Sequence, residues 1–313
     1  MTKPYAITFP GQGSQSVGML AELAAAHTVV RETFDEGSEA LGLDLWQLSQ
    51  EGPKERLNET EHTQPALLCA GIAVMRVLEP MLTDKPLVLA GHSLGEYTAL
   101  VAGGAIAFAD AVRLVAQRGR FMQEAVPAGT GAMAAILGLD DDAVRAVCGE
   151  GAQGDVASPV NFNSPGQVVV AGNAEAIARV AELAKAAGAK RALMLDVSVP
   201  SHCSLMMPAA QRLGDAMTTL QFGLPALPVI HNVDVAVAES PEQIKQRLVE
   251  QLYSPVRWVE TVQAIAARGA QVVIEAGPGK VLAGLIKRID KSLDAVPVFD
   301  PASLEKAMES LNA

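Results

Sequence analysis

Short continuous apolar runs alternate in this chain with longer stretches whose apolar residues recur at helical spacing. One run covers residues 5–9 and stops at a proline; another, over residues 86–90, stops at a glycine-rich turn. Helical spacing predicts helices over residues 29–41, 63–82, 94–103 and 110–125. Asp110 is a suitable N-cap for the last of these helices. Buried strands alternating with helices indicate a mainly parallel sheet with helices on both faces.

The order of elements changes after Pro127. The pattern predicts strands over residues 132–139, 156–162, 167–171 and 190–195, and helices over residues 140–148 and 173–187. This β-α-β-β-α-β order is typical of a ferredoxin-like unit. We therefore interpret residues 128–196 as a small domain inserted into a larger one, which consists of residues 1–127 and 197–313.

The larger domain continues beyond the insertion with more alternating elements. We predict helices over residues 205–220, 241–252 and 258–268, strands over residues 227–231 and 271–274, and a last helix after the turn at residues 275–280. The sequence therefore predicts one α/β domain with a smaller domain inserted in it.

A nucleophile elbow is predicted at Gly91-His92-Ser93-Leu94-Gly95, directly after the apolar run that ends at Ala90. A strand, a sharp turn with a serine and a helix are the context that such an elbow needs. The turn brings the residues two before and two after the serine close to neighbouring backbone, where only glycine avoids a clash. Ser93 is therefore the candidate nucleophile, at the positive end of the following helix.

Composition and charge narrow the function classes. The chain has 313 residues, is 50% hydrophobic and has a net charge of −11, which argues against general binding of nucleic acids. No apolar run is long enough to cross a bilayer, and the N-terminal residues lack the layout of a signal peptide. The three cysteines are scattered and lack metal-ligand spacing. We expect a cytoplasmic protein without zinc or disulfides.

A catalytic serine needs a base, and the chain has five histidines. His202 follows a strand and a proline, where open α/β sheets place their ligands, so it is either the base or a structural residue. His92 is expected to point away from Ser93 and to pack, and His231 either lines a site or ends its strand. No acid between Ser93 and His202 is obviously placed to orient an imidazole, so a carbonyl or an amide has that role if His202 is the base.

Several motifs occur in one order along the chain: residues 10–15, 91–97, 113–120, 200–202 and 275–279. Together they resemble the bacterial malonyl-CoA:acyl-carrier-protein transacylase family of type II fatty acid synthesis, from Tyr5 to about Ile289. The resemblance implies an α/β-hydrolase-like core with a ferredoxin-like subdomain. It also implies transfer of a malonyl group from malonyl-CoA to the phosphopantetheine thiol of acyl carrier protein, through a malonyl-serine intermediate.

The resemblance also implies roles for individual residues. Ser93 matches the nucleophile and His202 the general base, and Gln251 matches the residue whose main-chain carbonyl orients the histidine. Gln12 and Leu94 match the residues whose backbone N–H groups form the oxyanion hole.

Arg118 matches the arginine that binds the malonyl carboxylate. A guanidinium suits a free carboxylate because it donates two parallel hydrogen bonds. Without the family, Arg118 is simply one of three arginines on a helix, with Arg113 and Arg120, that pair with surface acids.

The implied reaction needs no metal or other cofactor, and we expect a monomer. Because the carrier protein of this pathway is acidic, we expect a basic patch at the mouth of the cleft, for which the candidates are Lys190, Arg191, Lys280, Lys287 and Arg288. Two rival functions remain at this stage. A serine hydrolase would need an acid beside the histidine and no Arg118, and a non-catalytic docking module would need no serine–histidine pair.

Overall fold

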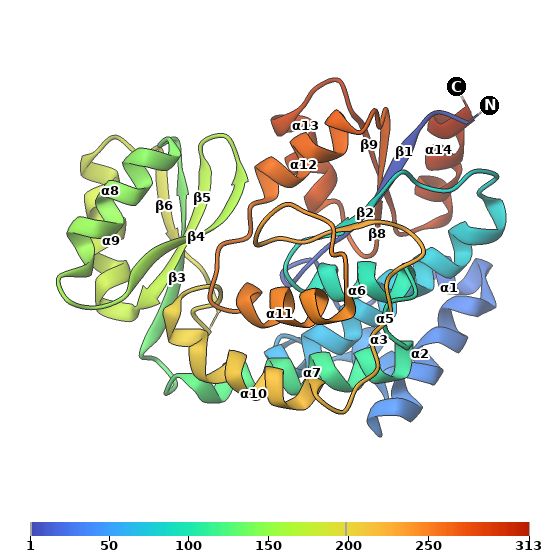
Figure 1. Cartoon of the computed structure of the whole chain (residues 1–313), viewed down its shortest axis with the longest axis horizontal. Coiled ribbons are helices and arrows are strands. Elements are labelled where there is room, and N and C mark those ends of the chain that lie inside the picture. Colours follow the sequence, from blue (N-terminus) through green and yellow to red (C-terminus); the bar gives the residue numbers. More distant parts are fainter. Residues whose placement is uncertain (1, 198, 313) are drawn as a thin grey trace.

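The computed structural model describes residues 2–197 and 199–312, which form two separate sheets (Figure 1). The larger sheet is parallel, in the order β7-β2-β1-β8-β9. Its strands are β1 (Tyr5–Phe9), β2 (Leu89–Gly91), β7 (Val229–Ile230), β8 (Val272–Ala276) and β9 (Asp294–Val298). A mixed α/β protein with a parallel core sheet and a separate antiparallel sheet confirms the predicted fold class.

Helices cover both faces of the parallel sheet. Tyr5, Ile7 and Phe9 of β1 are buried in the larger apolar core, whereas Ala6 belongs to a second core on the opposite face. The larger core contains residues of α2 (Thr28–Leu41), α5 (Thr60–Leu78), α7 (Phe108–Ala125), α10 (Met207–Met217), α11 (Pro241–Gln251) and α14 (Pro301–Asn312). The second core contains residues of α12 (Trp258–Ala267) and α13 (Val281–Ile289). Alternate side chains of a strand point to opposite faces, so an apolar run such as β1 is buried on both.

The smaller sheet is antiparallel and lies to one side of the larger one (Figure 1). Its strand order is β4-β5-β3-β6, with β3 (Gly131–Leu137), β4 (Ala157–Ser164), β5 (Gln167–Asn173) and β6 (Arg191–Met194). Two helices, α8 (Asp141–Ala152) and α9 (Ala174–Ala186), pack on one face. This is the β-α-β-β-α-β order expected from the sequence. The division at residues 128 and 196 stays an interpretation.

The N-terminal part of the chain contains three short helices that the sequence analysis did not predict: α1 (Ala21–Ala26), α3 (Leu45–Glu51) and α4 (Lys54–Leu57). The chain also continues beyond α13, so the prediction of a last helix there was wrong: β9 and α14 follow. Pro297 lies inside β9, and a proline removes a donor from a strand. It is tolerated because β9 forms the edge of the sheet.

The predicted N-cap of α7 was also wrong. The helix begins at Phe108 with Ala107 as its N-cap, and no side chain caps it. Asp110 instead lies in the first turn, where its carboxylate pairs with Arg113 at 2.8 Å. An acid in the first turn still interacts favourably with the helix dipole.

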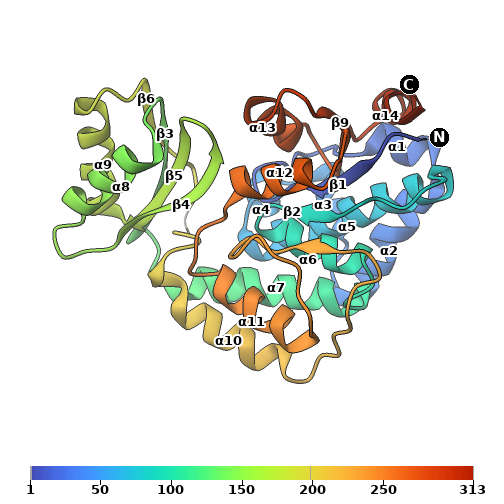
Figure 2. The ribbon, with the colours of Figure 1, turned by 45° about the horizontal axis from the view of Figure 1, so that its top comes forward.

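The two ends of the described chain lie side by side, far from the antiparallel sheet (Figure 2). The backbone N–H of Lys3 donates to the carbonyl of Leu311 at 2.8 Å. None of the helices in the described ranges combines the length and the apolar character that spanning a membrane requires.

Candidate active site

Ser93 lies between β2 and α6 (Leu94–Ala102), with φ 52° and ψ −108°. A positive φ is unfavourable for a residue with a side chain, and such strain is typical of functional turns. The two glycines around it are required sterically. A Cβ on Gly91 would lie 1.9 Å from the carbonyl carbon of Gly95, and one on Gly95 would lie 2.0 Å from the oxygen of Phe9. The close approach predicted for both glycines is confirmed.

His202 lies beside the serine. Its Nε2 is 2.7 Å from Ser93 Oγ, and its Nδ1 is 2.7 Å from the main-chain carbonyl oxygen of Gln251. A carbonyl only accepts, so Nδ1 carries the hydrogen and Nε2 is left to accept a proton from the serine. Burial, and secondly the positive charge of Arg118, lowers the pKa of His202 to about 3. The imidazole is therefore neutral at physiological pH, as a general base must be.

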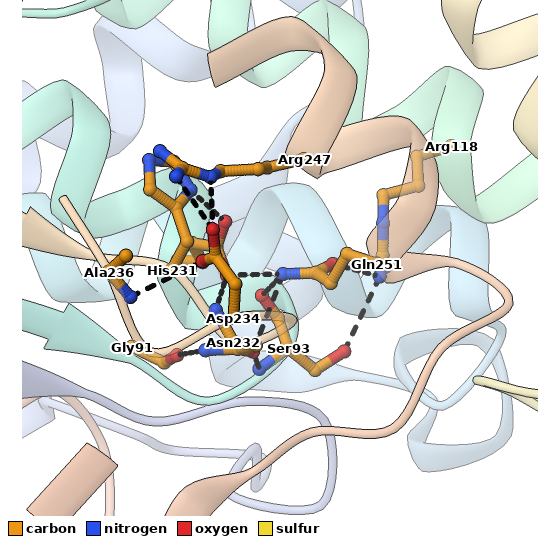
Figure 3. Close-up of polar contacts among 10 residues, drawn as sticks. Gly91, Ser93, Arg118, His231, Asn232, Asp234, Ala236, Arg247 and Gln251 are labelled. Carbon is orange, nitrogen blue, oxygen red and sulfur yellow. Dashed lines mark hydrogen bonds and ion pairs between the residues drawn. The ribbon is translucent and has the colours of Figure 1, made fainter. Parts of the chain in front are cut away.

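Arg118 reaches the same point from α7. It is 1% exposed, and its Nη2 donates to Gln251 Oε1 at 3.0 Å and lies 3.4 Å from Ser93 Oγ (Figure 3). Its Nε has no hydrogen-bond partner within the described ranges. Arg113 and Arg120, on the same helix, are exposed and pair with acids. The surface interpretation thus fits these two arginines and not Arg118.

A cavity of about 220 Å³ surrounds these groups, between the parallel sheet and the smaller sheet. Gln12 and Leu94 line it together with Ser93, His202 and Arg118. The backbone N–H groups of Gln12 and Leu94 have no acceptor among residues 2–197 and 199–312. Leu94 is also the first residue of α6, whose N-terminus favours negative charge. The structure thus brings all six residues singled out in the sequence to one place.

His92 lines the cavity too, but its ring hydrogen-bonds to Asn163 and not to the Ser93 hydroxyl, whose imidazole partner is His202. His92 Nε2 is 2.8 Å from Asn163 Oδ1, and its ring packs against Trp258, with centroids 5.5 Å apart. Burial lowers the pKa of His92, so it is neutral. Its contacts join the elbow to β4 of the smaller sheet and to α12, which makes it a packing residue at the junction.

Sequence reasoning missed two buried polar residues beneath the elbow, Glu96 and Asn232, both 0% exposed. Asn232 Oδ1 accepts from the backbone N–H of Ser93 at 2.8 Å, and Asn232 Nδ2 donates to the carbonyl of Gly91 at 2.8 Å. Asn232 therefore supports the strained turn from both sides. The signal for Glu96 was present, because it is the one acid in an otherwise apolar helix start. His231, left open above, does not line the cavity and instead contacts Glu96.

One group of candidate metal ligands occurs in the part of the chain that the structure describes, formed by Glu59, Glu61 and His62. Its members do not line the cavity, and His62 already pairs with Glu59 at 2.9 Å. Exposed acidic groups of this kind are common without a bound ion. We assign no metal site to it.

The fold and the site together define an α/β protein with a serine–histidine pair at the carboxyl ends of parallel strands, next to a buried arginine. Comparison with known proteins gives the family. The family model described as an acyl transferase domain matches residues 7–304, and the chain belongs to this family.

Curated relatives match the chain along nearly its whole length. The malonyl CoA-acyl carrier protein transacylase of Escherichia coli K12 is 56% identical over 305 residues, which are 97% of this chain and 99% of that protein. The Bacillus subtilis protein of the same name is 46% identical over 308 residues, covering 98% and 96%.

Solved structures agree. The malonyl CoA-acyl carrier protein transacylase of Coxiella burnetii has a TM-score of 0.98 at 48% identity, covering 100% of this chain and 99% of that one. A type II PKS acyl-carrier protein has been solved in complex with its malonyl-transacylase, which has a TM-score of 0.96 at 56% identity and covers 98% and 99%.

Proposed function

We propose that this chain transfers a malonyl group from malonyl-CoA to the phosphopantetheine thiol of acyl carrier protein and so supplies fatty acid synthesis. The observation that carries the proposal is the contact set around Ser93: a neutral imidazole at 2.7 Å and a buried guanidinium at 3.4 Å. The first group activates a nucleophile, and the second binds a substrate that carries its own carboxylate. The curated relatives named above support the same activity.

The first half-reaction makes a malonyl-serine ester. His202 Nε2 takes the Ser93 proton as Oγ attacks the thioester carbonyl carbon. The resulting oxyanion accepts hydrogen bonds from the backbone N–H groups of Gln12 and Leu94. Each of these bonds contributes up to about 3 kcal/mol to transition-state stabilisation. The C–S bond then breaks, and His202 returns its proton to the sulfur of coenzyme A as this thiol leaves.

The second half-reaction runs the same chemistry in reverse. The phosphopantetheine thiol gives its proton to His202 and attacks the ester carbonyl. The Ser93–acyl bond breaks, and the proton passes from His202 to Ser93 Oγ, which restores the enzyme. Arg118 holds the malonyl carboxylate in both halves through N–H groups such as Nε.

The contacts of His202 separate this proposal from a serine hydrolase. A hydrolase with this elbow orients its histidine through an Asp or Glu. Here the partner of His202 Nδ1 is the main-chain carbonyl of Gln251. A carbonyl orients the ring without adding a full negative charge, and a buried arginine beside the serine has no role in simple ester hydrolysis.

Three further expectations belong to the proposal. The cycle uses no metal or redox cofactor, so dialysis against a chelator is expected to leave the rate unchanged. The enzyme works in the cytoplasm, in keeping with three buried unpaired cysteines in the described residues. It acts as a monomer, which light scattering after size-exclusion chromatography tests. A rate that returns only with added metal would contradict the first expectation. Secretion of the protein would contradict the second, and a dimeric mass the third.

Intact-mass spectrometry tests the central proposal. After exposure to malonyl-CoA, the wild-type chain is expected to gain the mass of one malonyl group, and the Ser93→Ala variant is expected to gain nothing. Addition of holo acyl carrier protein should move that mass to the carrier much faster than free malonate appears. Release of malonate without transfer would instead identify a thioesterase.

A further inference from the structure

A carboxylate is buried directly beneath the elbow. Glu96, in the first turn of α6, is 0% exposed and accepts three hydrogen bonds: from His231 Nδ1 at 2.7 Å, from the backbone N–H of Asn232 at 2.8 Å and from Gln251 Nε2 at 2.8 Å. Three N–H donors suit an ionised carboxylate, which only accepts. Burying an acid is costly unless its hydrogen bonds are complete. We therefore examine what Glu96 does for the groups that it contacts.

The Gln251 amide contacts Glu96 with its nitrogen and Arg118 with its oxygen; Figure 3 shows the contact with Arg118. Its Nε2 donates to Glu96 Oε2 at 2.8 Å and to the Ser93 carbonyl at 3.1 Å, and its Oε1 accepts from Arg118 Nη2 at 3.0 Å. A carboxylate accepts and a guanidinium donates, so only one orientation of the amide satisfies both neighbours. The opposite orientation would set the NH₂ group against the guanidinium and the oxygen against the carboxylate.

Gln251 also serves the catalytic histidine, because its main-chain carbonyl accepts from His202 Nδ1 at 2.7 Å. One residue thus touches the arginine with its side chain and the histidine with its backbone. Whatever fixes the conformation of Gln251 therefore fixes both. Among the described residues, Glu96 is the one acidic group that the Gln251 amide contacts.

We propose that Glu96 is a positioning residue for malonyl selection: it orients the Gln251 amide so that Oε1 holds one Nη group of Arg118 and leaves the other N–H groups for the substrate carboxylate. The inference rests on the proposed function, because it concerns the site that distinguishes malonyl from acetyl. The serine–histidine pair has no acid in contact with His202 among residues 2–197 and 199–312. Glu96 acts on the site indirectly, through its hydrogen bond to Gln251.

The readout is the ratio of Ser93 acylation rates with malonyl-CoA and acetyl-CoA, measured by rapid quenching and intact mass. Glu96→Met removes every acceptor at similar length, and we expect it to lower this ratio roughly 10-fold. Glu96→Gln is expected to retain most of the ratio. Its amide oxygen can replace Oε2 towards Gln251 while its NH₂ faces His231, whose ring can accept there in the other tautomer.

Glu275 provides a matched control. It is the other glutamate of the described residues at 0% exposure, and it accepts from the backbone N–H groups of Leu282 and Ala283 at 3.0 and 2.8 Å. Glu275→Met also removes a buried acid, but one whose hydrogen bonds go to the start of α13 rather than to Gln251. It is expected to lower the melting temperature and leave the malonyl-to-acetyl ratio unchanged.

A double-mutant cycle tests whether Glu96 acts through Gln251. Gln251→Met keeps the main-chain carbonyl and removes the amide, so it should lower the ratio on its own. Adding Glu96→Met should then change the ratio no further. Independent effects that multiply in the double variant would overturn the proposal, as would a wild-type ratio in Glu96→Met.

If Glu96→Met does not fold, Gln251→Met alone still decides, because an unchanged ratio in that variant rejects the proposal. The wild-type chain separates this inference from the proposed function. A wild-type chain that takes no malonyl group from malonyl-CoA contradicts the function itself. Normal malonyl transfer by the wild type, together with an unchanged malonyl-to-acetyl ratio in the variants, contradicts only the role of Glu96.

Discussion

Arg118 is the one side chain with a permanent charge among the described residues that line the cavity. It is buried, and none of the ion pairs of the described chain includes it. Its neighbours are the neutral groups of Ser93 and Gln251 and the ring of Tyr97, whose centroid lies 5.3 Å from the guanidinium carbon. A buried charge with no counter-charge in direct contact is unfavourable in the free enzyme. Under the proposed function, the malonyl carboxylate would provide that counter-charge.

Replacing Arg118 with alanine should therefore act on one substrate only. We expect malonyl transfer to fall at least ~100-fold, since a charged hydrogen-bonded pair is worth about 3 kcal/mol. Acetyl transfer should be unchanged or faster. Steady-state rates with both thioesters check this, with Arg113→Ala on the exposed side of the same helix as the control. Equal losses for both thioesters would make Arg118 a structural residue.

The charge of Arg118 also affects the titration of His202. Burial is the main cause of the lowered pKa of His202, about 3, and Arg118 is the second. A base with so low a pKa stays neutral as the pH falls through 6.5, so kcat/KM for acylation should not decline there. Removing the positive neighbour should raise the pKa of His202, which moves the acid limb of the profile to higher pH.

Acetyl-CoA is the right substrate for this measurement, because it makes no use of Arg118. The pH profile of Ser93 acylation is compared between the wild type and Arg118→Ala. We expect the acid limb of the wild type to lie well below pH 6.5 and below that of the variant. A wild-type limb near 6.5, or a limb that moves down in the variant, would contradict this account.

At the scale of the elements, the elbow depends on backbone packing as much as on its serine. A Cβ on Gly95 would lie 2.0 Å from the carbonyl oxygen of Phe9 in β1, so α6 packs on the strand with no room for a side chain. Because both partners are backbone, neither can rotate away. The sheet and the helix would have to separate, and Ser93 would move with the helix.

We therefore expect Gly95→Ala to lower the free energy of unfolding by at least ~2 kcal/mol and to abolish transfer. Gly149 on α8 is the matched control, because a Cβ there meets nothing within 4 Å. Gly149→Ala should be neutral or stabilising by up to about 1 kcal/mol, as expected for alanine in a helix. Denaturant unfolding measures both. A Gly95→Ala variant as stable as the wild type would show that the elbow tolerates a wider turn.

Elements with a clear apolar period were predictable from the sequence, and those held by the rest of the fold were not. The order of strands and helices from β3 to β6 follows the pattern closely, since each element buries one regular face. β9 was missed because Pro297 argues against a strand, and only its place at the sheet edge makes the proline acceptable. The short helices α3 and α4 have too few turns to show a period.

The candidate site was predictable to a similar degree. Ser93 and its glycines follow from local sequence alone. His202 was a candidate base from its place after a strand, and the family resemblance decided its role and supplied those of Gln251 and Arg118. They meet only in the folded chain, since Ser93 and His202 are 109 positions apart and Arg118 and Gln251 are 133 apart. Asn232 was missed for the same reason, because its partners are groups of the elbow that no local motif connects to it. Glu96 lies within the elbow motif, but its partners His231, Asn232 and Gln251 meet it only in the folded chain.

At the scale of the whole molecule, the cavity lies where the two sheets meet. Met133 and Val169 of the smaller sheet line it opposite Ser93, and Leu282 of α13 closes another side. The exposed Arg288, also on α13, donates to Gln167 Oε1 of β5 at 2.7 Å, which ties the two parts together at the surface. A carrier protein that delivers its thiol to Ser93 must therefore approach near this junction.

Because the chain has a net charge of −11, we expect an acidic carrier to need a local basic patch for docking. The exposed basic residues Lys287 and Arg288 lie in the last turn of α13, beside the cavity-lining part of that helix. We expect Lys287→Glu with Arg288→Glu to raise the KM for acyl carrier protein roughly 10-fold and to spare hydrolysis of malonyl-CoA. Lys185→Glu on α9, which packs on the outer face of the smaller sheet, is the control. The wild-type KM should also rise with added salt, because screening weakens such contacts. An unchanged KM in the double variant would reject this patch and place the carrier elsewhere on the rim.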